Sequence, residues 1–369
     1  MSDRLSATAT ARGRPILVES VPNFSEGRRF DVISKIAAAA GARLLDSDPD
    51  PDHNRFVLSI GGAADRVRDC VYDAIAVAVE TIDLRAHTGV HPRVGAADVV
   101  PFVPLTSAAG LTPAIELAHQ LGERVWAELR VPVLFYGAAA PDGKRALQEI
   151  RGPSPPAPDI GSGRHPTAGW VCIGARWPLV AYNVLLPGVP VTTASLIARS
   201  IRMSSGGLPG VQALGFAVTL GSQVSTNLTA LELTSPQAVL AAVQVLCRSL
   251  DVRPGADQVV GLCPAAHALP AASGALLEGR LGAAGARLGA LAARAGDPSQ
   301  LGLATQLEAG ADRLATLPYV GQHLLAGAEE MAAIKHLLVA HHIADPEAIA
   351  LLEHAARELA RVAQQSAEA

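Results

Sequence analysis

The chain has 369 residues, of which 49% are hydrophobic and 17% are charged, a composition that excludes a disordered protein, and its formal net charge of −4 argues against nucleic-acid binding. Its apolar stretches fall short of the roughly 18 residues of a membrane span, and residues 1–15 predict a flexible polar tail without a signal peptide. Four widely separated cysteines in no zinc-binding spacing favour reduced thiols in a cytoplasmic protein.

The first part of the chain, residues 16–168, alternates short apolar strands with amphipathic helices. Gly41 is a typical residue after a helix end, and Thr112–Pro113 is a typical helix start. This alternation predicts a sheet with helices on one face. Strands are expected at 16–21, 42–46, 54–61, 99–103 and 131–136, and helices at 30–40, 65–82 and 112–129.

A proline-rich connector over 151–168 precedes a second unit, residues 169–264, which has a similar order of elements. Residues 265–369 are expected to be all-helical, with oligomerisation or capping as their default role. The predicted fold class is therefore α+β: two similar α/β subdomains with stacked sheets and outer helices, plus a helical extension. In the second unit, strands are expected at 170–175, 179–186, 211–219, 223–233 and 258–262, and helices at 191–204 and 236–250.

The segment 83–98 concentrates residue types that carry chemistry, with two histidines, two arginines and two aspartates. Its glycines and Pro92 exclude a regular helix, so it predicts a loop that leads into the strand 99–103. Imidazole has the unperturbed pKa nearest neutrality, and His91 is the predicted proton-transfer residue. His87 stands four residues before His91. Two histidines at this spacing can bind one metal ion when they lie on a helix, and because this segment is not a helix, no metal site is predicted.

Nine short blocks in order, spread over residues 16–265, carry a resemblance to a known family. They are 21–27 (VPNFSEG), 44–48 (LLDSD), 54–55 (NR), 91–96 with 98–104, 158–161 (PDIG), 165–169 (HPTAG), 174–176 (GAR), 223–227 (QVSTN) and 260–262 with Pro264. Together they resemble the glutamate formiminotransferase (formimidoyltransferase) family, the transferase part of formimidoyltransferase-cyclodeaminase. The resemblance covers about two thirds of the chain.

The resemblance implies a dimeric, folate-dependent enzyme of histidine degradation, whose ligands lie between the sheets of two α/β subdomains. It implies transfer of a formimino group from N-formimino-glutamate to N5 of tetrahydrofolate, the co-substrate. It places the catalytic histidine at His91 and its charge partner at Asp48. Guanidinium groups bind carboxylates by two hydrogen bonds, so Arg55, Arg93 and Arg176 are expected to hold the substrate carboxylates. The remaining expected substrate or folate contacts are Asn54, Gly161, His165, Gly169, Trp170 and Asn227.

Three departures from the family pattern leave the donor and the acceptor open. The connector 151–158 is shorter than usual, Val90 stands where the family has a polar residue, and Trp170 and Cys172 replace smaller residues. The alternatives are a formyltransferase that uses 5-formyl-tetrahydrofolate and a non-catalytic folate-binding protein. The helical end does not match the deaminase domain of the fused relatives, so no cyclodeaminase activity is expected. Partners are expected to be small molecules and a second copy of the chain, not nucleic acid or a membrane.

Overall fold

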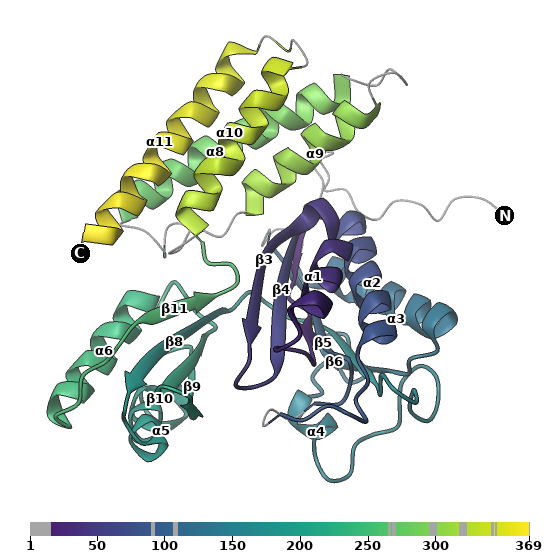
Figure 1. The fold of residues 1–369 in the computed structure, drawn as a ribbon, viewed down its shortest axis with the longest axis vertical. Coiled ribbons are helices and arrows are strands. Elements are labelled where there is room, and N and C mark those ends of the chain that lie inside the picture. The colour runs from purple at the N-terminus through teal and green to yellow at the C-terminus, as the bar shows by residue number, and fades with distance from the viewer. Residues whose placement is uncertain are drawn as a thin grey trace. The chain divides into compact units, whose positions relative to one another are not determined.

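The structure is a computed structural model that describes residues 16–89, 93–105, 110–264, 267, 271–294, 301–316, 323–340, 343 and 345–368. The chain divides into two compact units, Met1–Pro178 and Leu179–Ala369. Both units combine strands and helices, and helices alone make up the described C-terminal part (Figure 1). The predicted α+β class is confirmed.

The first unit is built on a seven-stranded mixed sheet. Its order is β1-β4-β2-β5-β7-β6, with β3 paired to β4 and an additional pairing between β1 and β5. β5, β7 and β6 run parallel to one another, whereas the other pairs are antiparallel. The strands are β1 (Leu17–Ser20), β2 (Asn23–Phe24), β3 (Leu44–Asp50), β4 (Arg55–Ala63), β5 (Ala97–Pro104), β6 (Val133–Gly137) and β7 (Val171–Ala175).

Three helices cover one face of this sheet: α1 (Phe30–Ala39), α2 (Ala64–Thr81) and α3 (Thr112–Leu129) (Figure 1). Alternate strand residues point to opposite faces, and those that face the helices are apolar. Phe56, Leu58 and Ile60 of β4 are fully buried there, in one core with Val67 and Val71 of α2. Burial of this apolar area is the main term that stabilises the unit.

The opposite face of the sheet, here called the back face, carries a smaller apolar cluster and several charged side chains. A short helix, α4 (Leu147–Ile150), contributes to this cluster through Ile150. The other members come from β5, β6, β7 and the segments just before them. The cluster consists of Val94, Val99, Leu134, Tyr136, Ile150, Trp170 and Cys172.

The second unit contains a four-stranded antiparallel sheet of order β11-β8-β10-β9. Helices α5 (Val191–Ile201) and α6 (Pro236–Ser249) share a core with one face of it. Ser235 caps α6 by accepting a hydrogen bond from the backbone N–H of Ala238 at 3.2 Å. The strands are β8 (Val180–Pro187), β9 (Val211–Val218), β10 (Gly221–Leu228) and β11 (Asp257–Val260).

The described C-terminal helices share a separate core that includes Leu281, Leu288, Met331 and Leu352. Asp345 caps the last helix by accepting a hydrogen bond from the backbone N–H of Ala348 at 3.0 Å. None of the helices in the described part of the chain combines the length and the apolar character that a membrane crossing requires. The helices are α8 (Ala271–Arg294), α9 (Leu301–Thr316), α10 (His323–Ala340) and α11 (Pro346–Glu368).

One strand lies in a different sheet from the one expected. Residues 170–175 were predicted to open the second unit, but β7 pairs in parallel with β5 and β6 of the first sheet. The first compact unit therefore extends to Pro178, and the second begins at Leu179 instead of residue 169. All five residues of β7 are buried. Its apolar sequence therefore indicates a strand covered on both faces, but it does not indicate which strands pair with it.

Candidate active site

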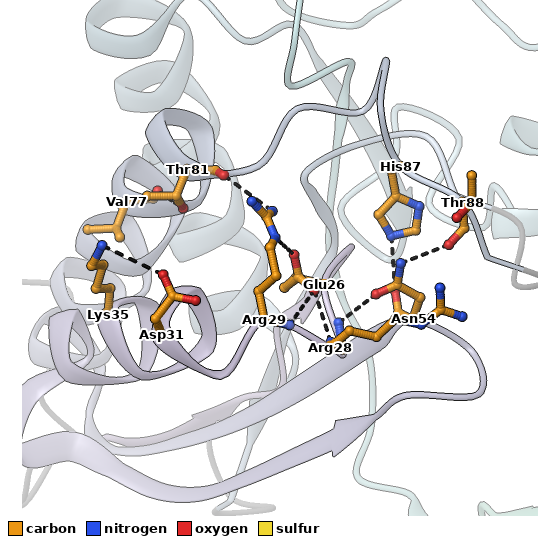
Figure 2. A network of polar contacts seen from close by, with 11 residues as sticks. Glu26, Arg28, Arg29, Asp31, Lys35, Asn54, Val77, Thr81, His87 and Thr88 are labelled. Atoms are coloured by element: carbon orange, nitrogen blue, oxygen red, sulfur yellow. Dashed lines mark hydrogen bonds and ion pairs between the residues drawn. The ribbon is translucent and has the colours of Figure 1, made fainter.

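Asn54 fastens the loop that precedes the predicted catalytic histidine to the start of β4 (Figure 2). Its side-chain oxygen accepts a hydrogen bond from the backbone N–H of Gly27 at 2.9 Å, and its amide nitrogen donates to the carbonyl of Thr88 at 2.8 Å. Its own carbonyl lies 3.0 Å from Nε2 of His87. Asn54 adopts the left-handed backbone region, with φ of 49°, which asparagine tolerates better than most residues.

Glu26 fixes the neighbouring turn before α1 (Figure 2). It is only 3% exposed, and its carboxylate accepts hydrogen bonds from the backbone N–H groups of Arg28 (2.9 Å) and Arg29 (3.0 Å) and from Nε of Arg29 (2.5 Å). Burial alone would raise its pKa, but these donors outweigh burial and hold the pKa of Glu26 below its usual value. No pattern in the sequence predicted a role for Glu26, although it lies in the block 21–27.

His87 presents a neutral imidazole with one unused nitrogen. Because Nε2 faces the Asn54 carbonyl, it carries the proton, which leaves Nδ1 as an acceptor. Nδ1 is buried, and no group in the described part of the chain donates to it. Burial, followed by the positive charge of Arg93, lowers the pKa of His87.

Arg93, at the other end of the same loop, hydrogen-bonds back to the residues that begin it. Its guanidinium donates to the carbonyls of Gly89 at 3.2 Å and of His87 at 3.1 Å. His91, the predicted catalytic residue, lies between these anchors and outside the described residues, with Val90 and Pro92. Hydrogen bonds therefore join the two described ends of the loop to one another, and Asn54 joins the first of them to the start of β4.

Charged groups gather around Arg55, where β4 begins. Asp50 is its direct partner in the β3–β4 register, and Asp48 lies two residues earlier on the same side of β3. Burial lowers the pKa of Arg55, and the carboxylates of Asp50 and Asp98 oppose that effect. Asp98 is 2% exposed and forms an ion pair of 2.5 Å with Arg151. The structure thus brings Asp48 and Arg55 into one charged region.

His165, Gly169 and Trp170, three of the expected substrate or folate contacts, lie in a segment that is clamped against the loop 93–98. Gly95 and Gly169 form a β-bridge, and the N–H of Trp170 donates to the carbonyl of Val94 at 2.9 Å. Gly169 has φ of 70°, and a Cβ there would lie 2.3 Å from the Val94 oxygen, so the close approach requires glycine. Nδ1 of His165 accepts the N–H of Ala168 at 3.0 Å, and burial lowers the pKa of this histidine.

Gly161, the Trp170 side chain and Asn227 have different surroundings. A Cβ on Gly161 would lie 2.5 Å from the ring of Trp126, so Gly161 packs against α3. Trp170 is 8% exposed within the back-face apolar cluster, and its indole N–H donates to the Gly163 carbonyl at 2.5 Å. Asn227 is an exposed residue of β10 in the second unit.

Arg176 directly follows β7, and its backbone N–H donates to the carbonyl of Phe102 at 3.1 Å. Two charged groups on β1 and β5, Glu19 and Asp98, are buried and were not among the predicted site residues. The signal for Glu19 is a charge inside the apolar run 16–21, which a buried strand accommodates only at a cost. Within the described residues, no cluster of His, Cys, Asp and Glu has a metal-binding arrangement.

The amino-acid sequence of this chain is similar to those of several known proteins. A model of the formiminotransferase domain, N-terminal subdomain, matches residues 17–176, which nearly coincide with the first compact unit. The chain is 34% identical over 268 residues to the glutamate formimidoyltransferase of Streptococcus pyogenes serotype M1, covering 68% of this chain and 89% of that protein. It is 37% identical over 272 residues to the glutamate formimidoyltransferase of Thermoplasma acidophilum, covering 67% and 88%.

Similarity also extends to longer proteins. The chain is 36% identical over 281 residues to the formimidoyltransferase-cyclodeaminase of Gallus gallus, covering 69% of this chain but 52% of that protein.

Proposed function

We propose that this chain, which belongs to the formiminotransferase family, transfers a formimino group between N-formimino-glutamate and N5 of tetrahydrofolate. The observation that carries the proposal is the match to two proteins named glutamate formimidoyltransferase over 89% and 88% of their lengths. The cyclodeaminase activity named for the longer relatives is not proposed, because the match covers only 52% of the Gallus gallus protein.

The reaction requires one bond to form, one to break and one proton to move. N5 of tetrahydrofolate attacks the amidine carbon of the formimino group, and a tetrahedral intermediate forms. The bond from that carbon to the glutamate nitrogen then breaks. The attacking nitrogen loses a proton, and the leaving nitrogen gains one. A single imidazole can serve both steps in turn, with a typical gain of about 10²–10⁴-fold.

We assign this proton transfer to His91 and propose Asp48 as its charge partner. The support for His91 is its residue type and its position in the loop whose flanks are held by Asn54 and Arg93. Because these contacts limit the motion of the loop ends, they lower the entropy lost when the reacting groups are aligned. Such alignment of two substrates contributes up to roughly 7–11 kcal/mol in favourable cases.

The tetrahydrofolate co-substrate and the homodimeric, cytoplasmic state are likewise proposed from the family resemblance. Light scattering of the purified chain tests the dimer, for which we expect twice the mass of 37.9 kDa. A monomer at micromolar concentration contradicts it.

An end-point assay tests the transferase function. The full chain is mixed with tetrahydrofolate and N-formimino-L-glutamate, treated with acid, and examined for the absorbance of 5,10-methenyl-tetrahydrofolate. We expect product from this donor and none from N-formyl-L-glutamate. A failure to form product with this donor and with other formimino compounds contradicts the proposed reaction.

The variant His91→Ala tests the assigned histidine. We expect turnover to fall at least 100-fold with folate affinity retained, in line with the loss of general acid–base catalysis. The matched control is His336→Ala, which changes an exposed histidine of α10 and should leave turnover unchanged. Full activity of the His91 variant contradicts the assignment without contradicting the reaction itself.

A further inference from the structure

The segment 94–96 begins three residues after His91, and hydrogen bonds fix all of its backbone N–H and C=O groups. Its carbonyl groups accept hydrogen bonds from two other segments of the first unit. The donors, in the chain order of these carbonyls, are the N–H of Trp170 (2.9 Å), Oγ of Ser25 (2.7 Å) and the N–H of Ser25 (2.8 Å). The N–H of Ala96 donates to the carbonyl of Ala168 at 2.9 Å. An irregular segment whose backbone groups are all bonded is held in a single geometry.

Asp98 accepts the two remaining N–H groups of this segment through its side chain. The N–H groups of Val94 and Gly95 donate to Oδ1 of Asp98 at 2.6 Å and 3.3 Å. Asp98 is the extra residue of a β-bulge, because two successive residues of β2 pair with Val99 and Ala97 and the register passes over Asp98. Bulges re-aim a side chain out of the regular pleat and are common beside active sites.

Arg151, the first residue of the connector 151–158, neutralises this buried carboxylate. Its guanidinium donates to Oδ2 of Asp98 at 2.5 Å, while Oδ1 accepts the backbone N–H groups. The Asp98 side chain is 2% exposed and that of Arg151 is 21% exposed, so both charges have lost most of their hydration. A buried ion pair adds little stability compared with apolar residues of similar volume. The fixed geometry that this pair imposes on its surroundings therefore explains it better than stability does.

We propose that Asp98 and Arg151 are positioning residues for the transfer reaction, which together fix the segment 94–96 and, through it, the place of the His91 imidazole. This inference rests on the proposed function. Proton transfer requires the imidazole to lie within hydrogen-bond reach of the nitrogen that it serves. A misplacement of about 1 Å can lower a rate about 100-fold even when its cause lies away from the reacting atoms. The pair acts through the backbone, so its loss should lower turnover and leave substrate affinity unchanged.

Hydrogen–deuterium exchange of the full chain tests the geometry without any substrate. Mass spectrometry follows the peptides that cover residues 93–98. We expect Asp98→Ala to raise the exchange rate there about tenfold, because the N–H groups of Val94 and Gly95 lose their acceptor. An exchange rate equal to that of the wild type overturns the inference.

Turnover in the acid-treatment assay tests the positioning role. We expect Asp98→Ala to lower turnover per folded molecule about 30-fold and Arg151→Gln about tenfold, with KM for both substrates within about threefold of the wild type. Arg151→Gln leaves the acceptor in place, so it remains a test if Asp98→Ala does not fold. Full turnover per folded molecule in Arg151→Gln overturns the inference, and so does a loss that appears in KM alone.

Arg151→Lys is the conservative variant, because it keeps a cation beside Asp98. We expect its turnover to stay within about threefold of the wild type. A loss as large as that of Arg151→Gln overturns the role assigned to the charge of Arg151.

The variant His91→Ala provides the test of whether the pair acts through the imidazole. In this background, Asp98→Ala should cause no further loss of turnover, because the group that it positions is already absent. A further loss of about tenfold overturns the action through His91.

The matched control is Arg145→Gln, which breaks another partly buried arginine–aspartate pair of the first unit, Arg145 with Asp159 at 2.6 Å. Circular dichroism measures the folded fraction of every variant. The control should change neither the exchange of residues 93–98 nor turnover per folded molecule, and equal losses in the control and in Arg151→Gln overturn the inference.

Failure of the proposed function gives a different result. A wild-type chain that forms no 5,10-methenyl-tetrahydrofolate, but whose exchange at 93–98 depends on Asp98, contradicts the transferase proposal and not the fixed geometry. Product from the wild type, together with full turnover in the Asp98 and Arg151 variants, contradicts the positioning role alone.

Discussion

Two buried carboxylates of the first unit, in the strand 17–20 and in the turn 25–29, have opposite environments. Glu26 in the turn accepts three hydrogen bonds, and its pKa lies below the usual value. No donor among the described residues hydrogen-bonds to Glu19 in the strand, and burial raises its pKa to about 7. Both side chains are less than a tenth exposed. Burial by itself therefore does not decide the charge of a carboxyl; the donors around it do.

This difference follows from the hydrogen-bond donors that surround each carboxyl. The charge of Glu26 is already satisfied by the backbone of its own turn and by Arg29, so it holds the chain in place before α1. For Glu19, burial is the larger influence and the positive charge of Arg176 only partly opposes it, so its neutral form is favoured more than that of an exposed glutamate.

The largest expected effect on stability comes from Glu26→Ala. The change leaves two backbone N–H groups and the Arg29 guanidinium without their acceptor, and we expect the free energy of unfolding to fall by about 3–4 kcal/mol. Urea denaturation followed by circular dichroism measures it. Asp31→Ala, which changes an exposed first-turn aspartate of α1, is the control and should cost less than about 1 kcal/mol. Equal losses in the two variants refute the structural role of Glu26.

Glu19→Gln should change stability in the opposite direction and with a pH dependence. The folded pKa of about 7 exceeds the unfolded value of 4.5, so the folded state binds more protons between these pH values. Stability from this group is therefore complete below pH 4.5 and falls as pH rises towards 7. Glutamine has no charge to bury at any of these pH values, so Glu19→Gln does not lose stability in this way. Above pH 7 its free energy of unfolding should exceed that of the wild type by up to about 3 kcal/mol.

Denaturation at several pH values compares Glu19→Gln with the wild type. A difference between the two that stays constant from pH 4 to pH 8 contradicts the raised pKa of Glu19. A difference that grows in favour of the wild type shows that its carboxylate is stabilised in the folded state.

Asn54→Ala tests the link between the turn 25–29 and the loop 84–89. The change removes hydrogen bonds to Gly27 and Thr88 and keeps a side chain at a positive φ, so we expect a loss of about 2 kcal/mol. Asn54→Gly is the control, because it removes the same hydrogen bonds but tolerates the backbone conformation. Alanine should be less stable than glycine, and both should lower turnover about tenfold. Wild-type turnover in either variant contradicts the positioning role.

The smallest expected effect lies outside this comparison, in the second unit. Ser235→Ala removes the cap of α6 and should lower stability by about 1 kcal/mol. Because Ser235 belongs to the second unit and the residues proposed to act belong to the first, turnover per folded molecule should stay unchanged. Thermal unfolding and the acid-treatment assay measure the two quantities, and a loss of turnover larger than the loss of folded protein contradicts this expectation.

The sequence alone determined the local elements, because their signals are short in range. The helix 112–129 has the predicted bounds, with Pro113 in its first turn, but its N-cap is Leu111 and no side chain caps it, so the predicted cap at Thr112 is wrong. The strand 54–61 is confirmed within two residues as β4. The family blocks identified the transferase relationship, and His91 stays a prediction because it lies outside the described residues.

Only the tertiary structure decided which of these elements meet. The five residues of β7 are apolar whichever sheet they join, and pairing with β5 and β6 is a contact between distant segments. Asn54 and His87 are 33 residues apart, so no local pattern showed their hydrogen bond. In the sequence, Glu19 is a single acidic residue in an apolar strand. Its burial and its interaction with the charge of Arg176 follow from the pairing of β1 with β4 and β5. Local sequence sets backbone preferences over a few residues, whereas burial and charge pairing depend on the whole folded chain.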